Sequence, residues 1–208
     1  KHDNASKLMV MLHGYGDNAA NFIHLANPID QDEWGMHYIS LNAPSIIPGN
    51  MMGYQWFDLY PGGVYISDAG PKEYELVNQE IESSILKLKE TINFYLLQLQ
   101  LKTKDCFIMG FSQGGIMTFE YARRMDSKLG GIGIVSGRII KKNEDINIYL
   151  KETPIFISHG SEDDVLPVAN FNDSVEYLKN NKYEFESHLV QGDTHTISPN
   201  TINLFQKF

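Results

Sequence analysis

The residues from Cys106 to Met125, CFIMGFSQGGIMTFEYARRM, decide the fold of this chain. They begin with a short apolar run, Cys106 to Met109, and end with a segment of helical period, Gly114 to Met125. Between them, Gly110-Phe111-Ser112-Gln113-Gly114 matches Gly-x-Ser-x-Gly, the sharp strand-to-helix turn that lifts a serine hydroxyl above a sheet. Glycine suits both flanking positions because a side chain there would crowd the turn. We therefore predict a strand, a nucleophile elbow at Ser112 and a helix.

Outside this stretch, short apolar runs alternate with longer segments of helical period. The alternation predicts an α/β fold, a mostly parallel sheet with helices on both faces. Five of the expected strands are near-continuous apolar runs, as central parallel strands should be, whereas the sixth alternates more and is expected nearer an edge. The expected strands are Leu8 to Leu12, His37 to Leu41, Cys106 to Met109, Gly131 to Val135, Ile155 to Ser158 and Phe185 to Val190. The expected helices are Ala19 to Ala26, Lys72 to Leu101, Gly114 to Met125, Val168 to Asn180 and Pro199 to the end.

The length and composition fit one globular domain spanning residues 1–208, with 42% apolar and 21% charged residues. A net charge of −9 without a basic cluster makes nucleic acid and anionic membranes poor partners. No apolar run is long enough to span a membrane, and a single cysteine, Cys106, excludes an internal disulfide. Cys106 lies in an apolar run and is expected to be a buried, unreactive thiol. The chain opens at Lys1, which indicates a processed or trimmed start, and the expected location is cytoplasmic.

The connection from Asn42 to Pro71 is long and rich in Pro and Gly, and it carries several large apolar side chains. Such side chains leave water when they can, so we expect an ordered excursion near the carboxyl edge of the sheet rather than disorder. The residues concerned include Met51, Met52, Tyr54, Trp56, Phe57 and Tyr60.

A serine nucleophile needs a histidine base, itself oriented by a carboxylate, and in this architecture the order along the chain is Ser, acid, His. Two histidines follow Ser112 and a plausible acid: His188 lies inside an expected strand, whereas His195 lies in the loop after it. Because the base must reach over the sheet edge from a loop, we favour His195. For the acid, Glu162, Asp163 and Asp164 follow an expected strand together, and spacing alone does not choose among them.

An oxyanion hole requires the backbone N–H after the nucleophile, here that of Gln113, and a second from an early strand-to-loop turn. The turn His13-Gly14-Tyr15-Gly16-Asp17 follows the first expected strand, and Tyr15 is the candidate donor. His13 and Asp17 also resemble two metal ligands, but no third ligand stands at a recognisable spacing, so no metal is predicted.

Taken together, these motifs resemble the phospholipase/carboxylesterase family, which includes acyl-protein thioesterases and small bacterial carboxylesterases. The resemblance spans Leu8 to the C-terminus. It is carried by Leu12-His13-Gly14-Tyr15-Gly16-Asp17, Ala43-Pro44, Trp56-Phe57-Asp58, Gly110 to Gly115, His159-Gly160-x-x-Asp163 with Pro167, and Gly192-x-x-His195.

The resemblance implies an α/β-hydrolase fold without a large cap domain and without a cofactor. The family's acid position falls on Asp163, its oxyanion positions on Tyr15 and Gln113, and its acyl-site loop on Trp56 and Phe57.

The expected reaction is hydrolysis of a small-molecule acyl ester or thioester, or of a lysophospholipid, through an acyl-enzyme on Ser112 with His195 and Asp163. Apolar side chains, including Trp56, Phe57 and Leu166, would favour a short to medium aliphatic acyl chain over a charged one. These aromatic side chains equally fit a homodimer contact. Two alternatives have different chemistry: a non-catalytic binding module on the same fold, and a serine peptidase or amidase.

Overall fold

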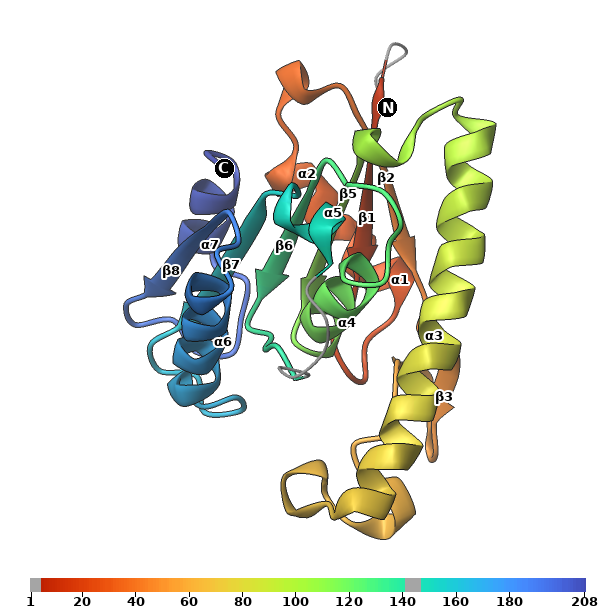
Figure 1. The fold of residues 1–208 in the computed structure, drawn as a ribbon, viewed down its shortest axis with the longest axis vertical. Helices are drawn as coiled ribbons and strands as arrows, with labels where there is room; N and C mark the ends of the chain where they lie inside the picture. Colours follow the sequence, from red (N-terminus) through yellow and green to blue (C-terminus); the bar gives the residue numbers. More distant parts are fainter. Residues whose placement is uncertain (1–4, 141–146) are drawn as a thin grey trace.

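The computed structural model describes residues 5–140 and 147–208 and has a six-stranded sheet at its centre (Figure 1). The strand order is β2-β1-β5-β6-β7-β8, and every pairing within this sheet is parallel. The strands are β1 (Lys7–Leu12), β2 (Met36–Leu41), β5 (Cys106–Phe111), β6 (Gly131–Val135), β7 (Ile155–Gly160) and β8 (Phe185–Val190). All six lie where the sequence predicts a strand.

The two edges of the sheet are β8 and β2. The edge position of β8 agrees with its alternating sequence. The expectation that the strand at His37 to Leu41 is central is wrong, because β2 pairs with β1 alone and is only half-buried after Met36. An edge position suits His37 and Ser40, whose polar side chains would have to be desolvated in a central strand.

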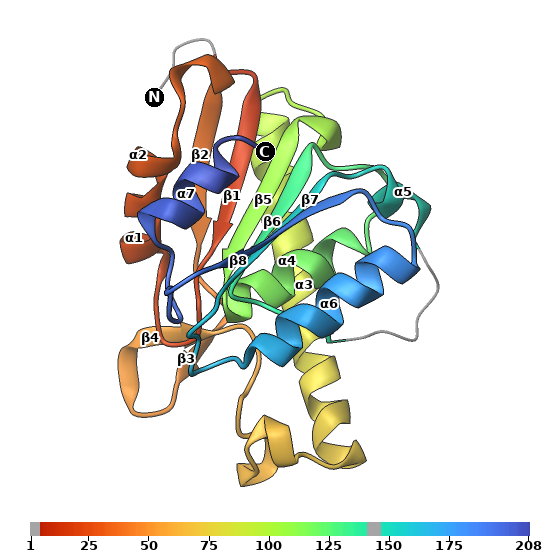
Figure 2. The same cartoon turned by 90° about the vertical axis from the view of Figure 1, so that its left-hand side faces the viewer.

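Helices cover both faces of the sheet, as Figure 2 shows in side view. One face carries α3 (Pro71–Gln98), α4 (Gln113–Ala122), α5 (Ile148–Lys151) and α6 (Val168–Asn180). The other face carries α1 (Ala19–Phe22), α2 (Ala26–Ile29) and α7 (Pro199–Phe205). The helix expected at Ala19 to Ala26 is interrupted, because a 3₁₀ turn separates α1 from α2. The 3₁₀ turns are Ile23–Leu25, Asp32–Trp34, Pro61–Gly63, Ile66–Asp68 and Thr103–Asp105.

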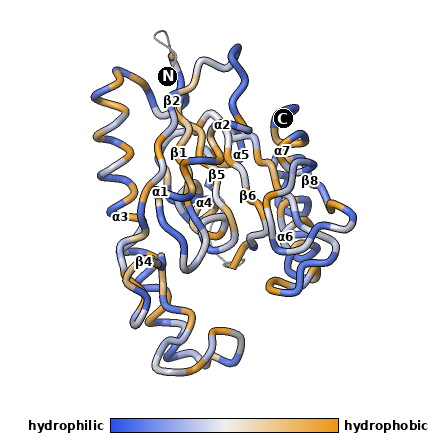
Figure 3. Tube along the Cα trace, turned by 180° about the vertical axis from the view of Figure 1, so that it is seen from behind, coloured by the Kyte–Doolittle hydropathy of each residue, from blue (hydrophilic) through white to orange (hydrophobic). Residues whose placement is uncertain are grey.

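The longest helix, α3, is amphipathic, and apolar and polar residues alternate along its trace in Figure 3. Its buried stripe recurs at steps of three and four residues and packs in the larger of two apolar cores. The stripe consists of Val77, Ile81, Ile85, Leu88, Ile92 and Leu96. Burial of this stripe stabilises α3 against the sheet.

The long connection before α3 is ordered in the structure. It forms an antiparallel hairpin, β3 (Ser45–Ile47) and β4 (Asn50–Gln55), followed by two 3₁₀ turns. Hydrogen bonds from Gly16 N–H to Tyr54 O and from Tyr54 N–H to Asp17 O join this hairpin to the loop after β1. The excursion is therefore attached to the carboxyl edge of the sheet, as its sequence predicts.

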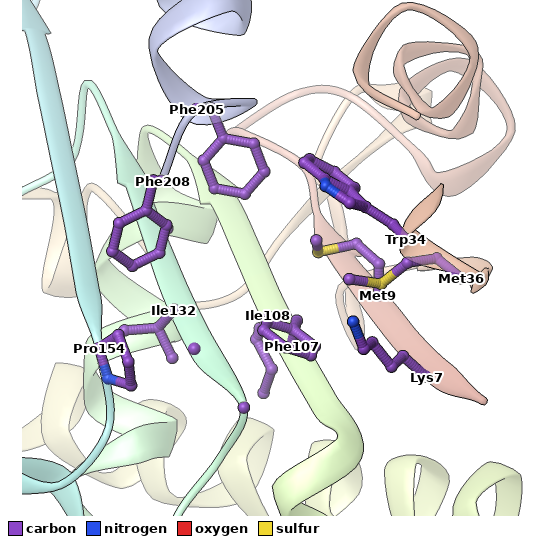
Figure 4. A pocket seen from close by; sticks show the side chains of 13 residues that line it. Lys7, Met9, Trp34, Met36, Phe107, Ile108, Ile132, Pro154, Phe205 and Phe208 are labelled. Atoms are coloured by element: carbon purple, nitrogen blue, oxygen red, sulfur yellow. The ribbon is translucent and has the colours of Figure 1, made fainter. Parts of the chain in front are cut away.

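At the opposite, amino edge of the sheet lies an apolar cavity of about 220 Å³ between α7 and the strands (Figure 4). Its walls are the aromatic rings of Trp34, Phe107, Phe205 and Phe208 with Met9 and Met36, and Lys7 lies at its side. None of the predicted site residues lines it. Within the described part of the chain, no helix combines the length and apolar character needed to cross a bilayer.

Candidate active site

Ser112 lies on a strained turn between β5 and α4. Its backbone has φ 54° and ψ −117°, outside the ordinary regions for an L-residue. The two flanking glycines are required by close backbone approaches: a Cβ at Gly110 would overlap the carbonyl oxygen of Gly114, and one at Gly114 would overlap that of Leu12. This geometry places the Ser112 side chain at the carboxyl edge of the sheet, as the elbow motif predicts.

His195 lies in the loop after β8 and meets Ser112 from a distance of 83 residues along the chain. Its Nε2 is 2.9 Å from the Ser112 Oγ, and its ring packs on Phe111 with the centroids 4.8 Å apart. The rival histidine, His188, is on β8 and packs on the Phe156 ring instead. The loop position therefore brings His195, and not His188, to the serine.

The carboxylate that reaches His195 belongs to Asp163. Its Oδ2 lies 2.7 Å from the His195 Nδ1, and its Oδ1 accepts hydrogen bonds from the backbone N–H groups of Val165 and Leu166 at 3.0 and 2.8 Å. The Asp163 side chain is buried, whereas Asp164 is exposed to solvent. Two backbone donors fix the Asp163 carboxylate in the orientation that His195 requires.

A second histidine, His159 near the end of β7, also contacts this carboxylate. Its Nε2 is 2.7 Å from the Leu166 carbonyl oxygen and 3.2 Å from the Asp163 Oδ2, and its ring is buried against Phe171. This contact was not predicted from the sequence. The only available signal was a histidine four residues before an acid at the end of an apolar strand.

The two candidate oxyanion donors follow β1 and β5: Tyr15 lies in the loop after β1, and Gln113 begins α4. The Gln113 N–H is the first of α4, so it has no partner within the helix. Among the described residues, none accepts a hydrogen bond from the Tyr15 N–H. Both amides remain candidates for binding a developing oxyanion.

The Gln113 side chain has a structural role that the sequence analysis did not anticipate. It accepts from the Trp56 N–H at 2.8 Å and donates to the Phe57 carbonyl oxygen at 2.8 Å, so it fixes the loop before α3. The Trp56 indole is 2% exposed and donates to the His13 carbonyl oxygen at 2.9 Å. The expectation that Trp56 contacts substrate is therefore corrected, since its ring belongs to the core and is absent from the cavity around Ser112.

A cavity of about 390 Å³ opens beside Ser112 and Gln113, and we call it the Ser112 cavity. Phe57 and Leu166, both expected to contact an acyl chain, line it, whereas Met51 and Met52 point into solvent on the β3–β4 hairpin. Its polar lining comes from Tyr15, Tyr65, Arg138 and Asn170, and its apolar lining from Phe57, Leu59, Ile66, Ile116, Ile140, Val165, Leu166 and Pro167. The sequence did not predict that Tyr65, Ile66 and Arg138 line this cavity.

Two titratable groups near this edge have perturbed pKa values. Burial lowers the pKa of His13, and hydrogen bonding to Gly14 and the charge of Asp17 oppose that effect. Burial, followed by the charge of Asp58, raises the pKa of the Tyr15 phenol, which therefore stays neutral in the physiological range. In residues 5–140 and 147–208, no three His, Cys, Asp or Glu side chains gather as a metal-binding group.

The fold and the geometry at Ser112 define an α/β hydrolase. Among solved structures, esterase PE8 has a TM-score of 0.83 at 25% identity, covering 100% of this chain and 93% of that chain. The phospholipase/carboxylesterase of Dyadobacter fermentans has a TM-score of 0.72 at 27% identity, covering 100% and 91%. Acyl-protein thioesterase 1 of Kluyveromyces lactis is 26% identical over 209 residues, covering 93% of this chain and 86% of that protein.

The model of the phospholipase/carboxylesterase family matches residues 1–208. The chain therefore belongs to this family, as its motifs indicated. It is an enzyme of the esterase class, a hydrolase.

Proposed function

We propose that this protein hydrolyses carboxylic esters or thioesters through an acyl-enzyme on Ser112, with His195 as base and Asp163 as the carboxylate that orients it. The observation that carries the proposal is the continuous hydrogen-bonded chain from the Ser112 Oγ through the His195 ring to the Asp163 carboxylate. Three distant segments would not converge in this order and orientation for packing alone.

In the first half-reaction the Ser112 oxygen attacks the substrate carbonyl carbon while the His195 Nε2 takes the hydroxyl proton. Asp163 accepts from the His195 Nδ1–H, keeps Nε2 free to act as base, and stabilises the imidazolium that forms. The Tyr15 and Gln113 N–H groups bind the oxyanion. Collapse of the intermediate breaks the bond to the leaving group, which takes the proton from His195.

In the second half-reaction water takes the place of the leaving group. His195 removes a proton from the water, the new oxygen bonds to the acyl carbon, and the ester bond to Ser112 breaks. Ser112 recovers its proton from His195, and the free acid leaves. No step requires a cofactor, because each proton passes between the substrate, water, Ser112 and His195.

The Ser112 cavity supports a small-molecule acyl substrate. Its apolar side chains fit the hydrocarbon part of an ester. The acyl-protein thioesterase relatives extend the candidate substrates to thioesters, because attack on the carbonyl does not depend on whether an alcohol or a thiol departs.

The direct test compares wild-type protein with Ser112→Ala. We expect turnover of p-nitrophenyl esters to fall by about 10⁶-fold and covalent labelling by a fluorophosphonate to disappear. Ser6→Ala is the matched control, because Ser6 is exposed at the opposite edge of the sheet. Near-normal turnover by Ser112→Ala would refute the nucleophile, and a folded wild-type protein that neither turns over nor labels would favour a binding module.

A further inference from the structure

Arg138 occupies an unusual place for a cation. It follows β6 by three residues, after a turn in which Ser136 has φ 47°, and it lines the same cavity as Ser112. It is half-buried, and among the described lining residues it is the one that carries a charge at neutral pH. The chain as a whole has a net charge of −9, so this cavity has a sign of charge opposite to that of the molecule.

The Arg138 guanidinium is sparsely paired. Its Nη1 donates to the Asn170 Oδ1 at 3.1 Å, while its Nε is inaccessible and has no hydrogen-bond partner among the described residues. The ion pairs between described residues join other groups, and none of them gives Arg138 a carboxylate partner. Desolvating a guanidinium with so few partners is unfavourable, and an anion would offset that cost.

A purely structural role would be to hold the loop after β6 against α6. That attachment exists without Arg138, because the Ile139 N–H donates to the Ser174 Oγ at 3.0 Å. The acceptor Asn170 is itself held by its backbone and its amide, both of which donate to the Pro167 carbonyl oxygen. Asn170 thus fixes one edge of the guanidinium instead of neutralising it.

We propose that Arg138 makes this enzyme selective for esters that carry a second, anionic oxygen group, a carboxylate or a phosphate, on the part of the substrate bound in the Ser112 cavity. This proposal rests on the proposed function and specifies its substrate class. An arginine fork binds either group through paired hydrogen bonds. This selectivity for anionic esters differs from the preference for an uncharged acyl chain that the apolar residues alone predict.

The test uses pairs of esters that differ in one charge. In the acyl arm, mono-p-nitrophenyl adipate is compared with p-nitrophenyl hexanoate, which has the same chain length without the carboxylate. In the leaving-group arm, p-acetoxybenzoate is compared with its neutral methyl ester, and p-acetoxyphenyl phosphate replaces the carboxylate by a phosphate. The measured quantity is the selectivity ratio, the kcat/KM of the anionic ester divided by that of its neutral partner.

We expect a selectivity ratio above one for wild-type protein in at least one arm. Arg138→Met should lower that ratio by about 10- to 100-fold, mainly through KM, because a hydrogen-bonded charged contact is lost. Arg138→Lys should be intermediate, since it keeps the charge without the fork. Lys128→Met changes the net charge equally on an exposed surface and should leave the ratio at the wild-type value.

A wild-type preference for the neutral ester in every pair, or an Arg138→Met ratio equal to that of wild type, would overturn the proposal. If Arg138→Met does not fold, inhibition of wild-type hexanoate hydrolysis decides: adipate must inhibit more strongly than hexanediol, and equal inhibition contradicts the proposal. If no ester is hydrolysed and Ser112 is not labelled, the proposed function has failed. Adipate must then still raise the thermal midpoint of wild type and not that of Arg138→Met.

Discussion

His13 is a buried histidine whose hydrogen bonds require the neutral ring. Its Nδ1 lies 2.7 Å from the Gly14 carbonyl oxygen, and its Nε2 accepts the Ala43 N–H at 3.1 Å. A proton on Nε2 would face that N–H donor, so protonation removes an acceptor as well as burying a charge. This agrees with the lowered pKa of His13, for which burial is the largest cause.

We therefore expect acid to destabilise the fold through His13. Because the folded-state pKa lies below the unfolded value of about 6.5, the unfolded state binds more protons as the pH falls below that value, and stability declines there. Well above a pH of about 6.5 the His13 ring is neutral in both the folded and the unfolded state, and its contribution to the free energy of unfolding is fully present. Urea unfolding between pH 5 and 7.5 should show a shallower decline for His13→Asn than for wild type, by at most about 1.4 kcal/mol per pH unit.

His24→Asn provides the control, because His24 is exposed. Its free energy of unfolding should follow the wild-type pH dependence. An unchanged slope in His13→Asn would show that another group carries the acid sensitivity.

The two adjacent acids after β7 should differ in their effect on catalysis. Asp163→Asn removes the acceptor of the His195 Nδ1–H, and kcat should fall by about 10⁴-fold if the wrong tautomer results. Asp164→Asn should change kcat little, because the Asp164 side chain is exposed. Steady-state kinetics with a p-nitrophenyl ester measure both, and the reverse ranking would move the acid by one position.

At this scale, the sequence predicted the residues that belong to local motifs. Ser112 and His195 each follow an expected strand within a recognisable turn, whereas Asp163 was separated from Glu162 and Asp164 only by the family resemblance. Arg138 and the Gln113 side chain act through contacts between segments far apart in the chain, for which one sequence carries no local pattern. The His159 contact with Asp163 is local, but a histidine four residues before an acid is too common a spacing to predict it. Trp56 illustrates the opposite error: an aromatic residue in a motif loop was interpreted as a substrate contact, but its indole N–H completes the hydrogen bonding of the His13 loop.

Among the elements, α7 connects the His195 loop to the sheet. Ser198 caps α7 by accepting from the Thr201 N–H at 3.2 Å, and its hydroxyl also donates to the Asp193 carboxylate within the same loop. Phe205 holds the other end of α7 in the core, with its ring centroid 5.2 Å from that of Phe156. Docking of α7 should therefore fix the loop that carries His195.

Phe205→Ala should lower the free energy of unfolding by about 3 kcal/mol, because it removes a buried aromatic side chain and enlarges the apolar cavity beside α7. Asn203→Ala is the matched control, since Asn203 is exposed on the same helix and its loss should change stability by less than about 0.5 kcal/mol. Equal midpoints for both variants in chemical denaturation would contradict the packing role of α7.

Element types followed from the sequence more reliably than element positions. Apolar runs and helical periods identified the six strands and the long helix, because burial against one sheet imposes those patterns. They did not place β2 at an edge, since the apolar content of a strand does not state how many neighbours it has. The interruption between α1 and α2 was also missed, because a 3₁₀ turn barely disturbs the spacing of apolar residues.

At the scale of the whole molecule, the reactivity of the single cysteine, Cys106, should measure global unfolding. Cys106 begins β5, between β1 and β6, where it pairs with Leu8 and is 0% exposed. Burial raises its pKa to about 12, so the native protein holds almost no thiolate at neutral pH. Because a strand with two neighbours opens only when the sheet separates, a thiol reagent should reach Cys106 through unfolding of the whole domain.

We therefore expect labelling of Cys106 by a chromogenic disulfide to be slower in the native protein than in urea by a factor of about 10³ to 10⁸, the range of folding equilibrium constants of small domains. If the opened sheet recloses faster than the reagent reacts, the logarithm of the labelling rate should rise linearly with urea concentration. Its slope should be proportional to the surface exposed on unfolding. The slope should then equal that of equilibrium unfolding followed by circular dichroism. Rapid, urea-independent labelling would instead mean that β5 opens locally beneath Ser112, so that the serine turn would lack the rigid support that its strained backbone requires.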